Sequence, residues 1–247
     1  MSHYFLNDDN LKSEIREIHC VFDNISFTFK TDNGVFSKNK LDYGTNLLIK
    51  NTLKVNPYGD VLDLGCGYGP IGIIIKKMFP VNMTMVDVNK RGVHLTKMNA
   101  KLNNVLVDTF VSDGFLNINN CFDFIISNPP IRIGKDNLYQ LIFDSMKHLK
   151  KDGTMIIVIR KEHGALSLIK DMSVYYNVKS LDKDKGFLII SLKNDWLLKL
   201  FVILIYVGDI LYFLICDLKK LFIMGWNEWL ISLLIVAIIV KEDPFLG

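Results

Sequence analysis

The sequence predicts an α/β fold built on a seven-stranded, mostly parallel sheet, followed by a hydrophobic helical C-terminal tail. Short apolar segments alternate with longer helical ones from residue 61 to residue 172, which favours a parallel sheet with helices on both faces. A glycine-rich corner joins the first of these strands to the first helix. Residues 175–181 and 187–192 flank a turn at 182–186, which predicts a terminal hairpin and a Rossmann-like sheet with one antiparallel strand.

Residues 1–34 predict a small accessory β element. A charged stretch at 11–18 has the composition of a short helix, and residues 20–22 and 25–30 follow as strands. In the second strand apolar and polar residues alternate, as on a half-buried strand. A turn at 32–34 closes the element, a loop covers 35–45, and a helix is expected at 46–54.

The rest of the body predicts the remaining strands and helices in strict alternation. Strands are expected at 61–64, 83–86, 106–111, 122–126 and 153–159. Helices are expected at 71–78, 90–102, 137–149 and 162–172. Pro80 stops the first of these helices, because proline cannot continue a helix. Residues 1–193 are therefore predicted to form one domain.

The composition changes at Asn194. Two 20-residue apolar stretches, 196–215 and 221–240, are separated by a short polar link. About 20 apolar residues span a bilayer, so residues 194–247 predict a two-helix membrane hairpin. Interfacial helices, helices that pack on each other, and an extension without a selected role are the alternatives. We expect the body to be cytoplasmic, with membrane contact through 196–240.

Charge and cysteine content limit the classes of function. The chain has 247 residues and a net charge of +3, but residues 194–247 hold four lysines and six carboxylates. The body therefore carries all of the positive excess, which permits a nucleic-acid partner without requiring one. The four cysteines form no C-x-x-C pair and no metal-ligand spacing with the five histidines. We therefore expect reduced thiols and no metal site.

The glycine corner carries the first candidate binding residues, Gly65, Cys66, Gly67 and Gly69. Glycine permits positive φ and lets a ligand approach the backbone closely. A dinucleotide fingerprint reads G-x-G-x-x-G, but here Pro70 stands in place of the third glycine. Proline has no N–H to offer a phosphate. The pattern therefore favours S-adenosylmethionine, which has no phosphate; a purely structural glycine turn is the alternative.

Acidic residues lie at the ends of successive predicted strands. Asp63 precedes the glycines and can orient their loop or reach the methionine ammonium. Asp87, followed by Val88, lies 22 residues after the first glycine and can accept both ribose hydroxyls. Asp113, followed by Gly114, can accept from an adenine amine. Each acid has an alternative role as a cap of the following turn or helix.

The fourth strand of this series ends in Ser127-Asn128-Pro129-Pro130. The Asn128 side-chain oxygen and the Pro129 carbonyl can accept both hydrogens of a substrate amine, and the prolines stiffen the loop. An amine conjugated to a ring is a poor nucleophile. Two acceptors that hold it toward tetrahedral geometry would free its lone pair for attack on a sulfonium methyl. An ordinary turn after a strand is the alternative.

These motifs together resemble class I S-adenosylmethionine-dependent methyltransferases, and within them the small-domain relatives of ribosomal RNA small subunit methyltransferase C. The resemblance covers residues 1–193. It rests on Gly34-Val35-Phe36-Ser37, Leu41-Asp42-Tyr43-Gly44-Thr45, the glycine corner, Val86-Asp87-Val88-Asn89, Ser112-Asp113-Gly114, and Asn128-Pro129-Pro130-Ile131-Arg132 with Gly134-Lys135.

The resemblance implies S-adenosylmethionine as cofactor and methyl transfer to the 2-amino group of a guanine in small-subunit ribosomal RNA. The partner would be ribosomal RNA or the small ribosomal subunit. The resemblance further implies that Asp87 binds ribose, Asp113 binds adenine, and the Asn128 loop binds the target amine. The remaining substrate contacts would come from Phe36, Asp42, Ile131, Arg132 and Lys135.

Ile131 departs from the family pattern, in which an aromatic residue often follows the prolines, so apolar contact or another ring must serve, and Phe36 and Tyr43 are the candidate rings. The same isoleucine argues against a protein-glutamine N-methyltransferase, which usually has tyrosine there. Pro70 argues against a nicotinamide dehydrogenase. A non-catalytic membrane-tethered adaptor is the third alternative, and the retained cofactor residues argue against it.

Overall fold

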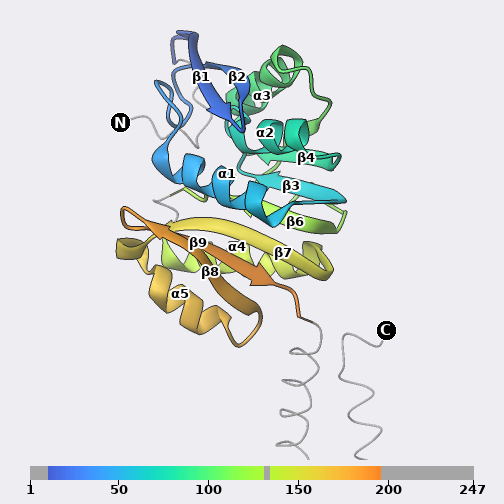
Figure 1. The fold of residues 1–247 in the computed structure, drawn as a ribbon, viewed down its shortest axis with the longest axis vertical. Helices are drawn as coiled ribbons and strands as arrows, with labels where there is room; N and C mark the ends of the chain where they lie inside the picture. Colours follow the sequence, from blue (N-terminus) through green and yellow to red (C-terminus); the bar gives the residue numbers. More distant parts are fainter. Residues whose placement is uncertain (1–10, 131–133, 196–247) are drawn as a thin grey trace, which may run out of the picture. The chain divides into compact units, whose positions relative to one another are not determined.

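The computed structural model describes residues 11–130 and 134–195. Its centre is a seven-stranded sheet in the order β5-β4-β3-β6-β7-β9-β8 (Figure 1). The strands are β1 (Arg16–Phe22), β2 (Ile25–Thr31), β3 (Asp60–Leu64), β4 (Asn82–Asp87), β5 (Asp108–Val111), β6 (Phe122–Ser127), β7 (Leu149–Arg160), β8 (Asn177–Asp184) and β9 (Phe187–Lys193). The helices are α1 (Tyr43–Val55), α2 (Pro70–Met78), α3 (Lys90–Leu102), α4 (Lys135–His148) and α5 (Ala165–Met172), with a 3₁₀ turn at Lys161–His163.

The strand directions confirm the predicted sheet. β3 is parallel to both β4 and β6, and the pairs β4–β5 and β6–β7 are also parallel. β9 is antiparallel to β7 and to β8, so one strand of the sheet runs against the rest. The chain moves outward from β3 through β4 to β5 and then returns to the other side of β3 with β6. Ligands of open α/β sheets bind at such a reversal, outside the carboxyl ends of the strands.

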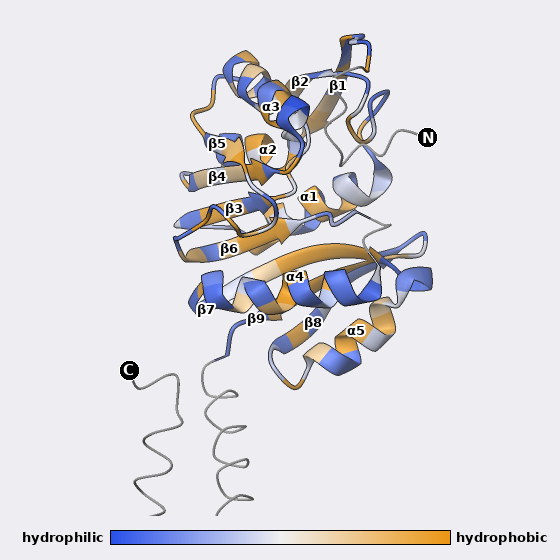
Figure 2. Cartoon of the chain, turned by 180° about the vertical axis from the view of Figure 1, so that it is seen from behind, coloured by the Kyte–Doolittle hydropathy of each residue, from blue (hydrophilic) through white to orange (hydrophobic). Residues whose placement is uncertain are grey.

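Apolar layers cover both faces of the sheet. Successive strand residues point to opposite faces, and in β6 Phe124 and Ile126 belong to one apolar cluster while Ile125 belongs to the other. The first cluster packs against α1, α2 and α3, and the second against α4 and α5. Figure 2 shows β6 and β7 mainly in hydrophobic colours and much of the visible side of α4 in hydrophilic ones. Burial on both faces holds the strand ends in fixed positions.

A separate two-stranded sheet, β1–β2, packs on α3. The Asn99 amide accepts from the backbone N–H of Lys30 at 2.7 Å and donates to its carbonyl at 2.9 Å. Asn103 binds Thr28 in the same two-bond manner, at 3.2 and 2.7 Å. Asn99 of α3 and Asn103, which caps the end of that helix, thus pair with the backbone of β2 as a neighbouring strand would, and the edge of β2 is not left with unpaired backbone groups there.

The predicted helix at 11–18 is wrong. Residues 16–22 form β1, and the residues before it are held by the buried Asp32. Its carboxylate accepts from the Ser13 hydroxyl at 2.8 Å and from the Glu14 backbone N–H at 2.5 Å. These contacts bind the segment to the far end of β2, which no local charge pattern could reveal.

Two helix starts differ from the prediction by three residues. α1 begins at Tyr43, three residues earlier than expected, because Asp42 caps it and accepts from the Thr45 N–H at 3.0 Å. α5 begins at Ala165 instead of residue 162, because Gly164 has a φ of 84° and separates it from the 3₁₀ turn.

Within residues 11–130 and 134–195, no helix combines the length and the apolar character needed to cross a membrane. The two apolar stretches that predict a membrane hairpin, 196–215 and 221–240, lie outside the described residues.

Candidate functional site

A cavity of about 210 Å³ opens at the carboxyl ends of β3, β4, β5 and β6. Most of the predicted site residues line it, and they come from segments that lie far apart in the sequence. These residues are Phe36, Gly65, Cys66, Gly67, Asp87, Val88, Asp113, Gly114, Asn128, Pro129 and Pro130. The cavity therefore lies at the reversal of strand order, where the topology places a ligand.

The glycine corner presents bare backbone to this cavity. Gly65 and Gly67 have φ values of 78° and 57°, in the left-handed region that favours glycine. A Cβ added at either position would meet no atom within 4 Å. The glycines are therefore required by conformation, and the space beside them is open for a ligand.

The loop is held from its other side by β4 and α3. The Gly67 N–H donates to Asp87 Oδ2 at 2.7 Å, and its carbonyl accepts from the Thr96 hydroxyl at 2.9 Å. Asn99 donates to the Tyr68 carbonyl at 2.8 Å. A Cβ on Gly92 would lie 2.8 Å from the Gly67 oxygen, so a glycine is needed for α3 to approach this closely.

Asp87 ends β4 and uses both carboxylate oxygens. Besides the Gly67 contact, Oδ1 accepts from the Asn89 N–H at 2.8 Å. Burial raises the pKa of Asp87, and the backbone hydrogen bonds oppose that rise. Asp113, by contrast, is exposed at the end of β5 and lines the same cavity. The two acids thus lie at adjacent strand ends, as predicted.

Asp63 and Gly69 do not line the cavity. Asp63 is fully buried beneath the loop, where Oδ2 accepts from the Gly72 N–H at 2.8 Å and Oδ1 has no hydrogen-bond partner. Burial raises its pKa to about 7. Gly69 caps α2 at a φ of 93°, where a Cβ would collide with Ile73 and Thr96. Both residues shape the loop and its helix from behind.

Burial also raises the pKa of the Cys66 thiol well above its usual range. The neighbouring carboxyls of Asp87 and Asp63 raise it further. A thiol in these surroundings stays protonated, so Cys66 is a small apolar wall of the cavity and has no nucleophilic character.

The Asn128 loop follows β6 and lies beside the glycine corner. The Ser127 hydroxyl donates to the Leu64 carbonyl at 2.7 Å, which joins the ends of β6 and β3. Asn128 Nδ2 donates to the hydroxyl of the buried Thr45 at 2.8 Å. Pro129 is buried and lines the cavity. The loop is therefore held by side chains on both sides of it.

The other predicted substrate residues are spread more widely. Asp42 caps α1 behind Thr45 and does not line the cavity. Tyr43 packs on Phe187, with ring centroids 5.8 Å apart, so Phe36 is the candidate ring that lines the cavity. Lys135 lies at the start of α4, 3.9 Å from an Asp171 carboxylate oxygen. Ile131 and Arg132 lie outside the described residues.

The sequence patterns assigned no role to Thr45, Thr96 or Asn99. Each is a buried polar side chain on a helix that binds a loop far away in the sequence. Only Thr45 had a local signal, since it follows a helix-capping aspartate at the spacing of an N-cap contact. In the described part of the chain, no group of three His, Cys, Asp or Glu side chains is placed to hold a metal ion.

A family model for the methyltransferase small domain matches residues 26–191. The chain is 38% identical over 197 residues to the uncharacterized protein YbxB of Bacillus subtilis, which covers 78% of this chain and 98% of that protein. It is 42% identical over 130 residues to the ribosomal RNA small subunit methyltransferase C of Pasteurella multocida, which covers 51% of this chain and 39% of that enzyme.

Among solved structures, the fold is similar to a 16S rRNA N2-guanine methyltransferase of T. thermophilus in complex with AdoMet and guanosine. The TM-score is 0.66 at 21% sequence identity, over 74% of this chain and 52% of that chain. The chain thus spans only about 39% to 52% of the two named rRNA methyltransferases.

The buried Asp63 predicts a pH dependence of folding stability. Its folded-state pKa of about 7 lies above the ordinary value of 3.8, so the native state holds the proton more tightly than the unfolded state. The stabilisation that this proton gives the folded state is complete below pH 3.8 and is lost as the pH rises through about 7. We expect the unfolding free energy of the wild type to fall relative to Asp63→Asn between these values, by up to about 1.4 kcal/mol per pH unit.

Urea denaturation at a series of pH values measures this difference. The exposed Asp108 on β5 gives a matched control, Asp108→Asn, for the loss of one carboxyl group. Parallel stability curves for the wild type and Asp63→Asn would show that Asp63 does not carry the predicted proton.

Proposed function

The chain belongs to the methyltransferase small domain family, and we propose that it transfers a methyl group from S-adenosylmethionine to guanine N2 in small-subunit ribosomal RNA. The observation that carries this proposal is the position of the Asn128 amide. It lines the same cavity as the bare glycine backbone and is held there by a hydrogen bond to Thr45. The site for the methyl donor and the group that would bind the amine thus share one cavity.

The cavity residues fit S-adenosylmethionine. The backbone at Gly65 and Gly67 leaves open space for a ligand, and Pro70 has no N–H to offer a phosphate. The Asp87 carboxylate accepts the backbone N–H groups of Gly67 and Asn89 and lines the cavity, where its remaining lone pairs can accept from the ribose hydroxyls. Asp113 can accept from the adenine amine. When bound, the cofactor supplies an electrophilic methyl group on its sulfonium.

The chain's own contribution to the reaction is to orient and polarise the amine. The Asn128 side-chain oxygen and the Pro129 carbonyl can each accept one amine hydrogen, which leaves the nitrogen lone pair directed at the methyl group. Of the described carboxylates near the cavity, Asp87 would be engaged by the ribose and Asp63 lies beneath the glycines, so neither is placed as a base for the amine. Positioning and electrostatic stabilisation are therefore the catalytic means.

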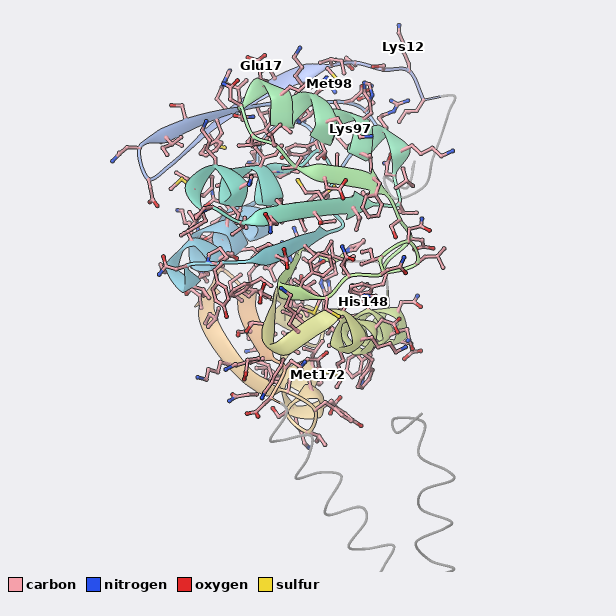
Figure 3. The ribbon with its side chains drawn as sticks, turned by 90° about the vertical axis from the view of Figure 1, so that its right-hand side faces the viewer. Lys12, Glu17, Lys97, Met98, His148 and Met172 are labelled. Atoms are coloured by element: carbon pink, nitrogen blue, oxygen red, sulfur yellow. The ribbon has the colours of Figure 1, made fainter. Side chains whose placement is uncertain are left out.

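An RNA substrate is supported by the surface of α3. Lys90, His94, Lys97 and Lys101 are exposed and follow a spacing that places them on one side of the helix. The helix contains no acidic residue. Figure 3 shows Lys97 on α3, at the end of the body that also carries Lys12. The names of the two rRNA methyltransferase relatives point to the same class of substrate.

Two variants that separate cofactor binding from methyl transfer test the roles assigned to Asp87 and Asn128. Asp87→Ala should weaken S-adenosylmethionine binding by at least about tenfold, because it removes both acceptors for the ribose. Asn128→Ala should bind the cofactor within about threefold of wild type and lose about a hundredfold or more in the rate of methyl transfer. Calorimetry measures the first quantity and tritium transfer to ribosomal RNA measures the second. An Asn128→Ala enzyme with wild-type turnover would refute the amine-binding role.

The basic face of α3 gives a second prediction. Lys97→Glu with Lys101→Glu should weaken binding to a ribosomal RNA fragment and reduce its salt dependence by about one to two units in the log–log slope. Cofactor affinity should stay unchanged. The control is Lys170→Glu with Lys179→Glu. It makes the same charge change at exposed lysines of α5 and β8, at the far edge of the sheet. Equal effects of the two double variants would show that α3 contributes only net charge.

A further inference from the structure

The Asn128 amide has two nearly isosteric orientations that differ by which end faces the cavity. One presents the carbonyl oxygen, which accepts hydrogens, and the other presents the NH₂ group, which donates them. Only the first suits an amine substrate. The structure contains a contact that selects between them, because Nδ2 lies 2.8 Å from the Thr45 hydroxyl oxygen.

The Thr45 hydroxyl must in turn act as the acceptor in that contact. Its oxygen lies 3.5 Å from Asp42 Oδ2, and an ionised carboxylate can only accept. The single hydroxyl hydrogen is therefore directed at Asp42, and the oxygen lone pairs are left for Asn128. The Asp42 carboxylate can only accept, so the Thr45 hydroxyl donates to it and accepts from Asn128 Nδ2.

Asp42 itself is held by the first turn of α1. Oδ2 accepts from the Thr45 N–H at 3.0 Å, and the Asp42 carbonyl accepts from the Asn46 N–H at 2.9 Å. A carboxylate at a helix N-terminus is further stabilised by the helix dipole. The start of α1 therefore provides both the charge and the geometry that orient the amide.

The rest of α1 is fixed against the terminal hairpin. A Cβ on Gly44 would lie 2.9 Å from the Phe187 ring, so glycine is needed for this approach. The Tyr43 hydroxyl donates to Asp184, and Asn51 Nδ2 donates to Asp182 Oδ2 at 2.8 Å. The Thr45 hydroxyl is thus carried on a helix that cannot easily move away from Asn128.

We propose that Asp42 and Thr45 are positioning residues, a hydrogen-bond relay that turns the Asn128 oxygen toward the cavity and so selects a substrate that presents N–H donors over one that presents a carbonyl oxygen. The proposal rests on the proposed function for its catalytic consequence, but the orientation of the amide can be measured without substrate. It also gives Asp42, which does not line the cavity, a defined part in substrate recognition.

Kinetics of three variants test the catalytic consequence. Thr45→Val keeps the shape of the side chain and removes the acceptor, and we expect kcat to fall about tenfold to a hundredfold with little change in cofactor Kd or RNA KM. Thr45→Ser restores a hydroxyl and should recover most of the rate. Thr52→Val is the matched control, because Thr52 is a fully buried threonine of the same helix whose hydroxyl has no partner.

A double-mutant cycle separates positioning from general damage to the fold. In an Asn128→Ala background, Thr45→Val should cause no further loss of rate, since the group that it orients is gone. Asp42→Asn keeps a good helix cap but can donate to Thr45, so its loss of rate should also vanish in that background. Additive losses, or failure of Thr45→Ser to recover activity, would overturn the relay.

Nuclear magnetic resonance of the ¹⁵N-labelled full chain tests the orientation itself. The Asn128 side-chain amide is identified by its absence from the Asn128→Ala spectrum. Its hydrogens should exchange at least about tenfold more slowly in the wild type and Thr45→Ser than in Thr45→Val. Unchanged exchange would refute the relay even if methyl transfer is observed. Slow exchange without methyl transfer to any amine would keep the relay and refute the proposed function.

Discussion

The site depends on the backbone of Gly67. Its N–H is bound by Asp87 from β4 and its carbonyl by Thr96 from α3, while Gly92 lets that helix come within direct contact of the same carbonyl. Two elements, β4 and α3, therefore hold the backbone of this residue from behind. Its front faces the cavity with no side chain in the way. A loop fixed this firmly loses little conformational entropy when a ligand binds, which is the physical advantage of preorganisation.

The second half of the site is built at the neighbouring strand end. Ser127 joins the end of β6 to the end of β3, so the Asn128 loop and the glycine corner keep a constant separation. The buried acid and thiol close to the corner have raised pKa values and favour their neutral forms. A reaction that needs only an oriented amine and an electrophilic methyl group suits these surroundings better than one that needs a strong base or a thiolate nucleophile.

Much of this arrangement was predictable because parallel sheets bring all strand carboxyl ends to one edge. The alternation of strands and helices, the glycine corner and the polar residues at successive strand ends are local patterns, and they predicted about half of the residues that line the cavity. Asp63 was predicted to orient the loop or to reach the cofactor, and it lies buried beneath the loop without lining the cavity. Its position in the strand gives no sign of which side of the loop it faces. The contacts of Thr45 and Thr96 join residues 83 and 29 positions apart, and the spacing between such partners is set by the fold alone.

Acceptor identity gives the most direct test of the central claim. The 247-residue chain would be incubated with tritiated S-adenosylmethionine and, in parallel, with small ribosomal subunits, deproteinised ribosomal RNA and release-factor protein. The release-factor protein serves as the acceptor for the alternative of protein-glutamine methylation. Digestion of the labelled products would then identify the modified group. We expect label in N2-methylguanosine from one or both RNA acceptors and none in the protein. Label on a protein glutamine, or no label on any acceptor despite cofactor binding, would contradict it.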